Sequence, residues 1–491
     1  MPIELNFDNS FARDMTGFYI PWKGDEVPEP RVIAVNEPLA RELGLDPDLL
    51  TTAEAAATLT GSALPEDATP LAMAYAGHQF GNFAPQLGDG RALLLGELLD
   101  VNGRRRDLAL KGSGPTPFSR GGDGKAVLGP VLREYLVSEA MYALGIPTTR
   151  ALAALRTGET ILREQGPQPG AVLCRVAASH IRVGTFEFFA ARGQRDHVRR
   201  LADYVITRHY PELEGSQSPY LGLFCKVRDA QAELVARWML VGFVHGVMNT
   251  DNTTICGETI DYGPCAFIDT YAPDAVFSSI DRFGRYAYAN QPLIAQWNLA
   301  RFAECLLHLI DPDDPKAAAG PAGDELDLFQ KRHDDAWLRG MRRKLGLFEQ
   351  HDEDLELARE LFRQLQGQQA DFTLFFRQLA LAADGDDAAL SGLLKTPEAL
   401  QPWLDDWRRR LAREQVPAEQ RLAAMNLANP LYIARNHKVE ESLTAANTGD
   451  MEPFERLLDA VRQPFTQRPG LEEYAGPAPS GFGRYVTFCG T

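Results

Sequence analysis

A predicted β-hairpin followed by one long helix constrains the fold of this chain more than any other feature. Residues 92–99 (ALLLGELL) are almost entirely apolar, and residues 107–111 (DLALK) alternate between polar and apolar side chains. The Asn102-Gly103 pair between them is typical of a tight hairpin turn. After a loop rich in Gly and Pro, apolar residues at helical spacing predict a helix over 128–144, which Gly145 ends.

The rest of the chain divides into a strand-rich part and a helical part. Further short strands are predicted at 149–155, 159–163 and 170–177, and from about residue 185 the pattern is mostly helical, with an Asp- and Pro-rich loop at 311–324. This order of elements predicts an α+β chain. Its predicted segments are an N-terminal extension (1–75), a strand-rich lobe (76–184), a helical lobe (185–310), a helical C-terminal extension (311–470) and a flexible tail (471–491).

Two charged residues lie at informative places in the strand-rich lobe. Lys111 ends the second strand of the hairpin, where its side chain could reach into a cleft and hold phosphate oxygens. Glu134 lies 23 residues later on the predicted helix and could orient Lys111 through an ion pair. Each also has an ordinary interpretation, as a solvated lysine at a strand end and as a surface carboxylate on a helix.

The segment His245-Gly-Val-Met-Asn-Thr-Asp-Asn252, followed by Asp261-Tyr-Gly263, carries the strongest signal. A glycine-containing hairpin, a lysine, a helical glutamate, an asparagine seven residues after a histidine, and then Asp-aromatic-Gly follow one another as in protein kinases. Asn252 and Asp261 take the positions of the metal-binding residues, and both offer the oxygen ligands that Mg²⁺ prefers. One such match is expected by chance, whereas five in the correct order are not.

One position departs from the kinase pattern. The catalytic base of a kinase stands two residues after the histidine, where this chain has Val247, which cannot accept a proton. Asp251 instead lies beside the metal-binding position. The residues leave three alternatives: a non-catalytic nucleotide-binding pseudokinase, an ordinary phosphotransferase with Asp251 as a displaced base, or a different transfer in a rearranged site.

Two glycines could bring backbone close to a nucleotide. Gly88 and Gly90 lie in residues 86–91 (QLGDGR), and Arg91 beside them could supply charge, although an ordinary turn is the simpler interpretation. A hairpin follows them and not a helix, which disfavours a dinucleotide-binding fold.

Further nucleotide contacts are predicted elsewhere in the strand-rich lobe. Arg175 and Arg182 could hold a polyphosphate between them, or could form surface ion pairs. Asp123 and Gly124 could touch a nucleotide, or could form a plain turn.

Four long strings of the sequence resemble the signatures of the selenoprotein O family (SelO, also called YdiU). They are residues 75–91 (YAGHQFGNFAPQLGDGR), 111–120 (KGSGPTPFSR), 249–264 (NTDNTTICGETIDYGP) and 429–440 (NPLYIARNHKVE). The similarity extends over nearly the whole chain. It implies a protein-kinase-like pseudokinase fold of two lobes, a small β-rich N-lobe and a helical C-lobe, that bind ATP in a flipped orientation.

The resemblance also implies an activity. Members of the family transfer AMP from ATP to Ser, Thr or Tyr hydroxyls of proteins and release pyrophosphate, and some use UTP with Mn²⁺. If the α-phosphate lies where a kinase keeps the γ-phosphate, a displaced base is accounted for, and arginines can neutralise the leaving group.

The roles implied by the resemblance fall on residues already singled out. Asp251 would accept the proton, Asn252 and Asp261 would hold Mg²⁺ or Mn²⁺, and Glu134 would orient Lys111. The predicted nucleotide contacts are Lys111, Arg175 and Arg182 at the phosphates, with Gly88, Gly90, Arg91, Asp123 and Gly124 lining the site.

The C-terminus departs from the family pattern. Many members end in selenocysteine or cysteine followed by two small hydroxyl residues, whereas this chain ends in Cys489-Gly490-Thr491. Some relatives have a partner cysteine in the loop after the metal-binding motif, which here reads Val276-Phe-Ser-Ser279. A redox role for Cys489 and an exposed thiol without a defined partner both stay open.

Composition and charge limit the partners and the cellular location that we expect for this chain. The formal net charge of −17 argues against nucleic acid as a partner. The longest apolar run, at 238–248, is too short to span a membrane, and the first residues are not a signal peptide. Six cysteines without CxxC spacing predict neither a disulfide scaffold nor a zinc site. These features predict a cytoplasmic monomer, and the resemblance implies that it acts on ATP and on proteins.

Overall fold

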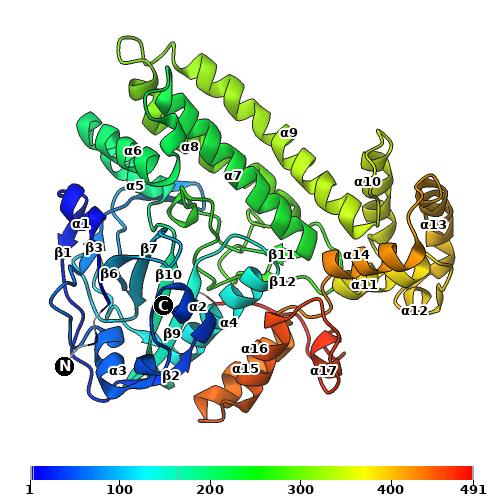
Figure 1. Cartoon of the computed structure of the whole chain (residues 1–491), viewed down its shortest axis with the longest axis horizontal. Coiled ribbons are helices and arrows are strands. Elements are labelled where there is room, and N and C mark those ends of the chain that lie inside the picture. The colour runs from blue at the N-terminus through cyan, green and yellow to red at the C-terminus, as the bar shows by residue number, and fades with distance from the viewer. Residues whose placement is uncertain (1–2, 4, 165, 489–491) are drawn as a thin grey trace.

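The computed structural model of the chain describes residue 3, residues 5–164 and residues 166–488. It is an α+β structure, in which an antiparallel sheet is built from the N-terminal part of the chain and helices make up most of the remainder (Figure 1). The predicted fold class is confirmed at this level. Cys489, whose role the sequence left open, lies outside the described residues.

One antiparallel sheet positions the strand-rich part of the molecule. Its strand order is β1-β3-β6-β7-β10-β9-β2, and β8 pairs with β10. The predicted hairpin is confirmed, because β6 pairs with β7 around a turn in which Gly103 has a φ of +74°. The strands are β1 (Tyr19–Pro21), β2 (Arg31–Val35), β3 (Leu71–Met73), β6 (Ala92–Leu99), β7 (Arg105–Lys111), β8 (Ala126–Val127), β9 (Arg150–Arg163) and β10 (Gly166–Ala177).

Two predictions about the sheet need correction. The prediction of three short strands within 149–177 is wrong, because the first two are a single strand, β9, which pairs along its length with β10. Residues 1–75, predicted as an N-terminal extension, contribute β1, β2 and β3 to the sheet. Helix α2 (Glu37–Glu42) begins after Asn36, whose side chain accepts a hydrogen bond from Leu39 N at 3.4 Å. The other helices of this segment are α1 (Ser10–Asp14) and α3 (Ala53–Thr60).

Helix α4 (Leu128–Ala143) confirms the predicted helix and lies between the sheet and the C-terminal helices. Nearly every residue from Leu128 to Met141 is buried, including Glu134 and Glu139. The helix therefore has no wide solvent-facing side, and its charged residues need partners inside the molecule.

The helical part begins with α5 (Val183–Ala190) and α6 (Arg195–His209), followed by three long helices. These are α7 (Pro219–Val241), α8 (Gln291–Ile310) and α9 (Ala319–Lys344). The predicted 311–324 loop is shorter than expected, since α9 already begins at Ala319. The remaining helices are α10 (Asp354–Leu365), α11 (Phe372–Ala382), α12 (Ala388–Ser391), α13 (Pro397–Leu411), α14 (Ala418–Ala428), α15 (Asn436–Asn447), α16 (Glu452–Arg462) and α17 (Glu472–Ala475).

Short elements shape the loops between the sheet and the long helices. A small hairpin pairs β4 (Gly77–Gln79) with β5 (Asn82–Ala84), and a two-stranded ladder pairs β11 (Phe243–Val244) with β12 (Ala266–Phe267). Single 3₁₀ turns are η1 (Leu49–Thr51), η2 (Pro211–Leu213), η3 (Thr250–Asn252) and η4 (Tyr288–Asn290).

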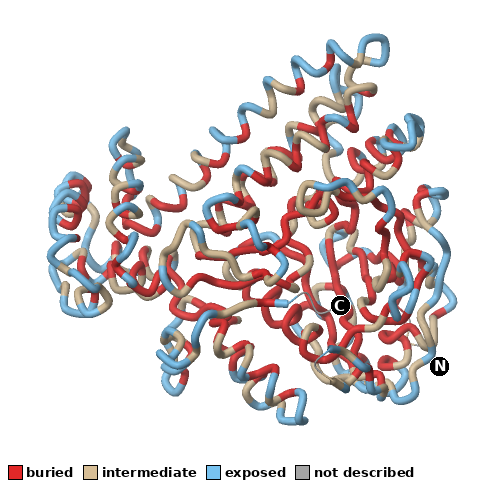
Figure 2. The backbone as a smooth tube through the Cα atoms, turned by 180° about the vertical axis from the view of Figure 1, so that it is seen from behind, coloured by how far each residue is buried: buried red, intermediate tan, exposed pale blue. Residues whose placement is uncertain are grey.

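Hydrophobic cores hold these layers together. One face of the sheet packs with α4, α5, α7, α8, α15 and α16, while the other face packs against α2 and α3. A separate core joins α9 to α10, α11 and α13. Figure 2 shows the sheet as mainly buried backbone and α7 as a mixture of buried and intermediate residues, whereas the outer length of α9 carries many exposed residues.

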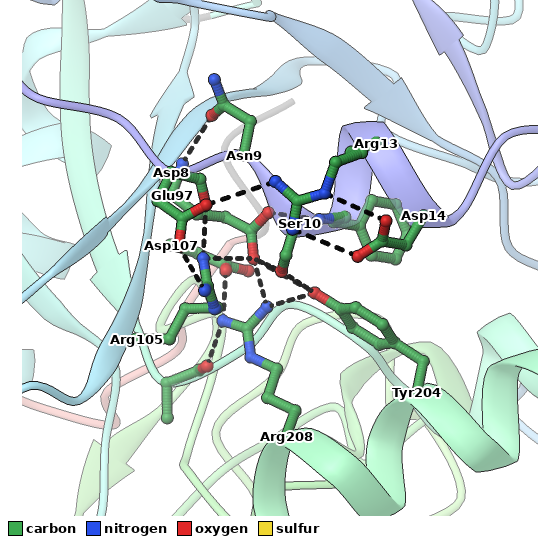
Figure 3. A network of polar contacts seen from close by, with 12 residues as sticks. Asp8, Asn9, Ser10, Arg13, Asp14, Glu97, Arg105, Asp107, Tyr204 and Arg208 are labelled. Atoms are coloured by element: carbon green, nitrogen blue, oxygen red, sulfur yellow. Dashed lines mark hydrogen bonds and ion pairs between the residues drawn. The ribbon is translucent and has the colours of Figure 1, made fainter.

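A buried ion cluster joins the sheet to α6 (Figure 3). Arg208 donates to Glu97 Oε1 at 2.7 Å, to Asp107 Oδ1 at 2.5 Å and to the Ala178 carbonyl. Tyr204 and Ser10 also donate to Glu97 Oε1, at 3.1 and 3.0 Å. Burial would raise the pKa of Asp107, but Arg208 and His180 together outweigh burial and hold that pKa well below its usual value. The cluster thus ties the N-terminal segment, two sheet strands and a helix into one unit.

The last described residues pack onto the loop that follows Asp261. Thr487 forms an isolated parallel bridge with Ser278, its amide donates to the Phe277 carbonyl at 2.8 Å, and its hydroxyl donates to the Pro264 carbonyl at 2.7 Å. Within the described part of the chain, none of the helices has the length and apolar character needed to cross a membrane.

Candidate active site

A cleft of about 650 Å³ brings most of the predicted site residues together. It lies between the sheet, the β4–β5 hairpin and the segment 245–252, which we call the catalytic turn. Of the predicted residues, those that line it are Gly88, Gly90, Arg91, Asp123, Gly124, Asp251, Asn252 and Asp261. Lys111, Glu134, Arg175 and Arg182 lie in the wall behind this lining and are connected to it by the contacts described next.

Lys111 lies at the centre of an ion cluster in the cleft wall. Its Nζ is 2.5 Å from Glu134 Oε2 and 2.6 Å from Asp261 Oδ1. Arg175 Nε donates to the other oxygen of Glu134 at 2.7 Å. Arg175 pairs with Ala109 across the sheet, and residues 109 and 111 point to the same face, so that both cations meet the α4 glutamate.

The charges of this cluster set the ionisation of its carboxylates. Burial by itself would raise the pKa of Asp261, but Lys111, Arg175 and Arg91 outweigh burial and hold it far below its usual value. Glu134 behaves in the same way, since Arg175 and Lys111 keep its pKa low despite burial. Both side chains are therefore anionic at neutral pH. Asp261 has a φ of +68°, a left-handed conformation uncommon for a side chain other than glycine.

Asp251 lies in the 3₁₀ turn η3 and lines the same cleft, although it is only 8% exposed. Burial raises the pKa of Asp251 to about 6, against the opposing effect of Arg182. Its Oδ2 accepts a hydrogen bond from Gln79 Nε2 at 3.3 Å. Its Oδ1 is shut off from solvent and has no hydrogen-bond partner among the described residues. A carboxylate in this setting can take up a proton near neutral pH.

Two other residues of the catalytic turn have structural partners. The Nε2 atom of His245 lies 2.9 Å from the carbonyl oxygen of Ile260, so this contact connects the turn to the residue before Asp261. The Asn252 amide nitrogen donates to the Val247 carbonyl at 3.0 Å, so its carbonyl oxygen stays available as an acceptor or ligand. Val247 lines the cleft with an apolar side chain, as the sequence indicated.

Arg182 holds the catalytic turn from the sheet side. Its guanidinium donates to the Asp251 carbonyl at 3.2 Å and to the His180 carbonyl at 3.2 Å. It also stacks on the Tyr75 ring at 4.4 Å and lies 3.7 Å from Asp89 Oδ1. Surface ion pairs were the alternative for Arg175 and Arg182, and both side chains are buried instead.

The glycine-rich loops are packed too tightly for side chains. Gly88 has a φ of +76°, and a Cβ there would lie 2.3 Å from the Phe118 ring. Gly124 has a φ of +64°, and a Cβ would lie 2.1 Å from the Gly114 carbonyl oxygen. Both loops therefore bring bare backbone to the cleft. The neighbouring Asp123 is held by Arg163 through two hydrogen bonds of 2.7 and 3.1 Å.

The sequence reasoning missed several residues of the cleft, chiefly Tyr75, Gln79, Asn249 and Arg163. The first two lie in residues 75–91, of which the sequence predicts roles only for Gly88, Gly90 and Arg91. Gly81 is a sequence signal for a tight turn. In the structure Phe80 and Gly81 form the hairpin turn, with positive φ angles of 52° and 84°. The contact of this hairpin with residues some 170 positions later has no local sequence signal.

Comparison with known proteins adds to this geometry. The sequence profile of the family described as "Protein adenylyltransferase SelO" matches residues 2–462. A protein of Cereibacter sphaeroides named "Protein nucleotidyltransferase YdiU" is 61% identical over 488 residues, which are 99% of this chain and 100% of that protein. Proteins of the same name from Rhizobium meliloti and from a Mycobacterium species are 58% and 57% identical, over 99% of each chain.

Proposed function

The chain belongs to the SelO family of protein adenylyltransferases, and on this premise we propose that it transfers AMP from ATP to Ser, Thr or Tyr hydroxyls of other proteins. As a protein nucleotidyltransferase it is an enzyme that uses a nucleotide as substrate. Transfer of UMP from UTP is a second activity of the same site in this proposal.

The fold proposed for this activity is that of a two-lobed, protein-kinase-like enzyme. The N-lobe (76–184) carries the sheet and α4, the C-lobe (185–310) carries the catalytic turn, and extensions flank them at 1–75, 311–470 and 471–491. The pairing of Lys111 on a strand with Glu134 on α4, which packs on the sheet, supports this assignment.

In the proposed complex, the nucleotide phosphates lie along the cations of the N-lobe. Lys111, Arg175 and Arg182 would face the phosphates, and Gly88, Gly90 and Gly124 would let them approach the backbone. Arg91 and Asp123 complete the lining. Glu134 keeps Lys111 and Arg175 in place, because its two oxygens accept from both.

The proposed step is an in-line displacement at the α-phosphorus. The acceptor hydroxyl oxygen forms a bond to that phosphorus, the bond to the bridging oxygen of the β-phosphate breaks, and pyrophosphate leaves with the bond's electron pair. Asp251 takes the hydroxyl proton, and the N-lobe cations stabilise the charge on the leaving pyrophosphate. The cation of Arg182 also fixes the backbone of Asp251, so the base and the phosphate site share one anchor.

Asn252 and Asp261 fit a divalent cation in this proposal. Their side chains line the same cleft, Asn252 has its carbonyl oxygen available, and Asp261 is anionic. No group of three His, Cys, Asp or Glu that could hold a metal occurs in the described chain, so two protein oxygens with phosphate oxygens suit Mg²⁺ or Mn²⁺ better than a closed protein site. The cation would supply neutralisation of phosphate charge.

One observation carries the proposal: a buried aspartate, Asp251, lines the same cleft as Asp261, which is tied to Lys111 and through it to Glu134. The test uses the purified protein with Mg²⁺, a cell extract, and ATP labelled at either the α- or the γ-phosphate. Covalent α-label on protein, with pyrophosphate released, is the expected result. Asp251→Ala and Asp261→Ala should each abolish the covalent α-label, while both variants still fold in the absence of ATP.

The alternatives predict different labels. Covalent γ-label alone would make the protein a phosphotransferase with Asp251 as a displaced base. Bound ATP without any label would leave a nucleotide-binding regulator, which Val247 at the kinase base position favours. Replacement of ATP by α-labelled UTP with Mn²⁺ tests the second nucleotide.

A further inference from the structure

We infer that Gln79 is a positioning residue that fixes the carboxylate of Asp251 for the acceptor hydroxyl. Gln79 lies on β4 and lines the cleft beside Asp251. The inference rests on the proposed function, because it gives Asp251 the role of proton acceptor. It adds a residue for which neither the charge pattern nor the kinase-like order of motifs provides a role.

The β4–β5 hairpin contacts the catalytic turn one residue after another. The amide of His78 donates to Thr250 Oγ1 at 2.7 Å, and the side chain of Gln79 donates to Asp251 Oδ2 at 3.3 Å. The amide of Phe80 donates to Asn249 Oδ1 at 3.2 Å. Three consecutive hairpin residues therefore hold three consecutive residues of the turn, and the middle contact falls on the base.

The two oxygens of Asp251 have different surroundings. Oδ1 is buried beside Gly77, where a Cβ would lie 2.5 Å from it, so only glycine leaves room for the carboxylate at this place. Oδ2 receives the Gln79 amide. A carboxylate oxygen has two lone pairs, so Oδ2 can accept from Gln79 and still take a proton from a second donor. The Gln79 hydrogen bond thus acts with the packing at Gly77 to fix the plane of the carboxylate, whose intrinsic torsional preference is broad.

The hairpin is itself anchored behind this contact. His78 Nδ1 lies 2.5 Å from Glu187 Oε1, and Thr250 Oγ1 donates to Glu187 Oε2 at 2.5 Å. Glu187 lies on α5 and is 4% exposed, so one buried carboxylate connects the hairpin and the catalytic turn. The backbone near Gln79 is therefore fixed independently of its side chain, and removal of the side-chain amide should change Asp251 without moving the hairpin.

The test compares Gln79→Met, which keeps the length of the side chain and removes its hydrogen bond, with Asn82→Ala in the same hairpin. Asn82 is exposed and pairs with Gln79 only through the backbone register. Transfer of α-labelled AMP gives kcat and KM, calorimetry gives the ATP affinity, and a thermal melt monitors folding. We expect kcat of Gln79→Met to fall roughly 10- to 100-fold, with KM for ATP, ATP affinity and melting temperature close to wild type, and Asn82→Ala to match wild type throughout.

Gln79→Glu is the second variant, since it keeps the shape but places a carboxylate against Asp251. We expect its kcat to fall at least as far as that of Gln79→Met. A kcat within twofold of wild type for both variants would overturn the inference, as would a loss of kcat matched by equal losses of ATP affinity and thermal stability. If the wild-type protein transfers no α-label, the proposed function fails and this inference falls with it; if wild type transfers normally and Gln79→Met does too, only this inference is wrong.

Discussion

At the scale of single residues, the cleft depends on Glu134 because it is the shared partner of two buried cations. Glu134→Gln would remove the charge that Lys111 and Arg175 share and would leave Asp261 as the carboxylate beside both cations. We expect AMP transfer to fall roughly 100-fold and the free energy of unfolding to fall by about 2 kcal/mol.

The control for this prediction is Glu139→Gln on the same helix. Glu139 is also buried and also paired, to Arg150 at 2.6 and 2.8 Å, but it does not line the cleft. We expect a similar loss of stability with transfer retained. Equal losses of transfer in the two variants, measured with α-labelled ATP and urea unfolding, would show that Glu134 acts only through stability.

Lys344 gives a prediction about pH. It is buried, its ammonium group lies 4.0 Å from the centre of the Phe376 ring, and burial lowers its pKa from 10.5 to about 7. Between pH 7 and 10.5 the unfolded chain holds a proton that the folded chain releases, so the contribution of Lys344 to stability rises with pH across this window and is least favourable below pH 7. Lys344→Met should therefore raise the free energy of unfolding by about 3 kcal/mol at pH 6 and by little near pH 10. The same gain at both pH values in urea unfolding would contradict this.

At the scale of elements, the loop at Gly88 requires glycine because of its close packing and not only because of its backbone conformation. A methyl group there would meet the Phe118 ring at 2.3 Å, whereas Gly103 in the β6–β7 turn has nearly the same φ and nothing within 4 Å of an added Cβ. We expect Gly88→Ala to raise KM for ATP severalfold and to destabilise the protein by about 2 kcal/mol. Gly103→Ala should cost only about 1 kcal/mol and leave KM unchanged, as steady-state kinetics and thermal melts can check.

The elements predicted correctly are those whose signals are local. The β6–β7 hairpin and α4 are read from a turn dipeptide and from periodicity within about 20 residues. The strands β1, β2 and β3 are short, and they join the sheet through partners far along the chain. The alternation of polar and apolar residues is therefore too brief to predict them.

The candidate site divides in the same way. The order of motifs predicts Lys111, Glu134 and Asp261 as site residues, and the structure brings them into contact. The sequence does not predict Gln79 as a site residue, because it contacts Asp251, 172 positions away, through a single side-chain hydrogen bond. Interactions of that kind follow from the folded geometry alone.

At the scale of the whole molecule, Arg208 joins the sheet to the helical part through the buried cluster of Figure 3. Arg208→Met would leave the carboxylates of Glu97 and Asp107 close together without their shared cation. We expect the free energy of unfolding to fall by about 4 kcal/mol. Arg13→Met is the control, because Arg13 pairs with Asp8 and Asp14 at the surface, and its loss should leave urea unfolding unchanged. Equal stability of the two variants would contradict this account of the cluster.

The packing of Thr487 against Ser278 and Pro264 has a consequence for how the molecule is made. A ribosome finishes the last cleft residue, Ile280, about 200 residues before it reaches Thr487. At ordinary rates of translation this interval is about 10 to 40 s. During that time a nascent chain holds every residue that lines the cleft, while the loop beside Ile280 still lacks Thr487, whose backbone pairs with it. The order of synthesis thus leaves one wall of the cleft unsupported until the final residues emerge.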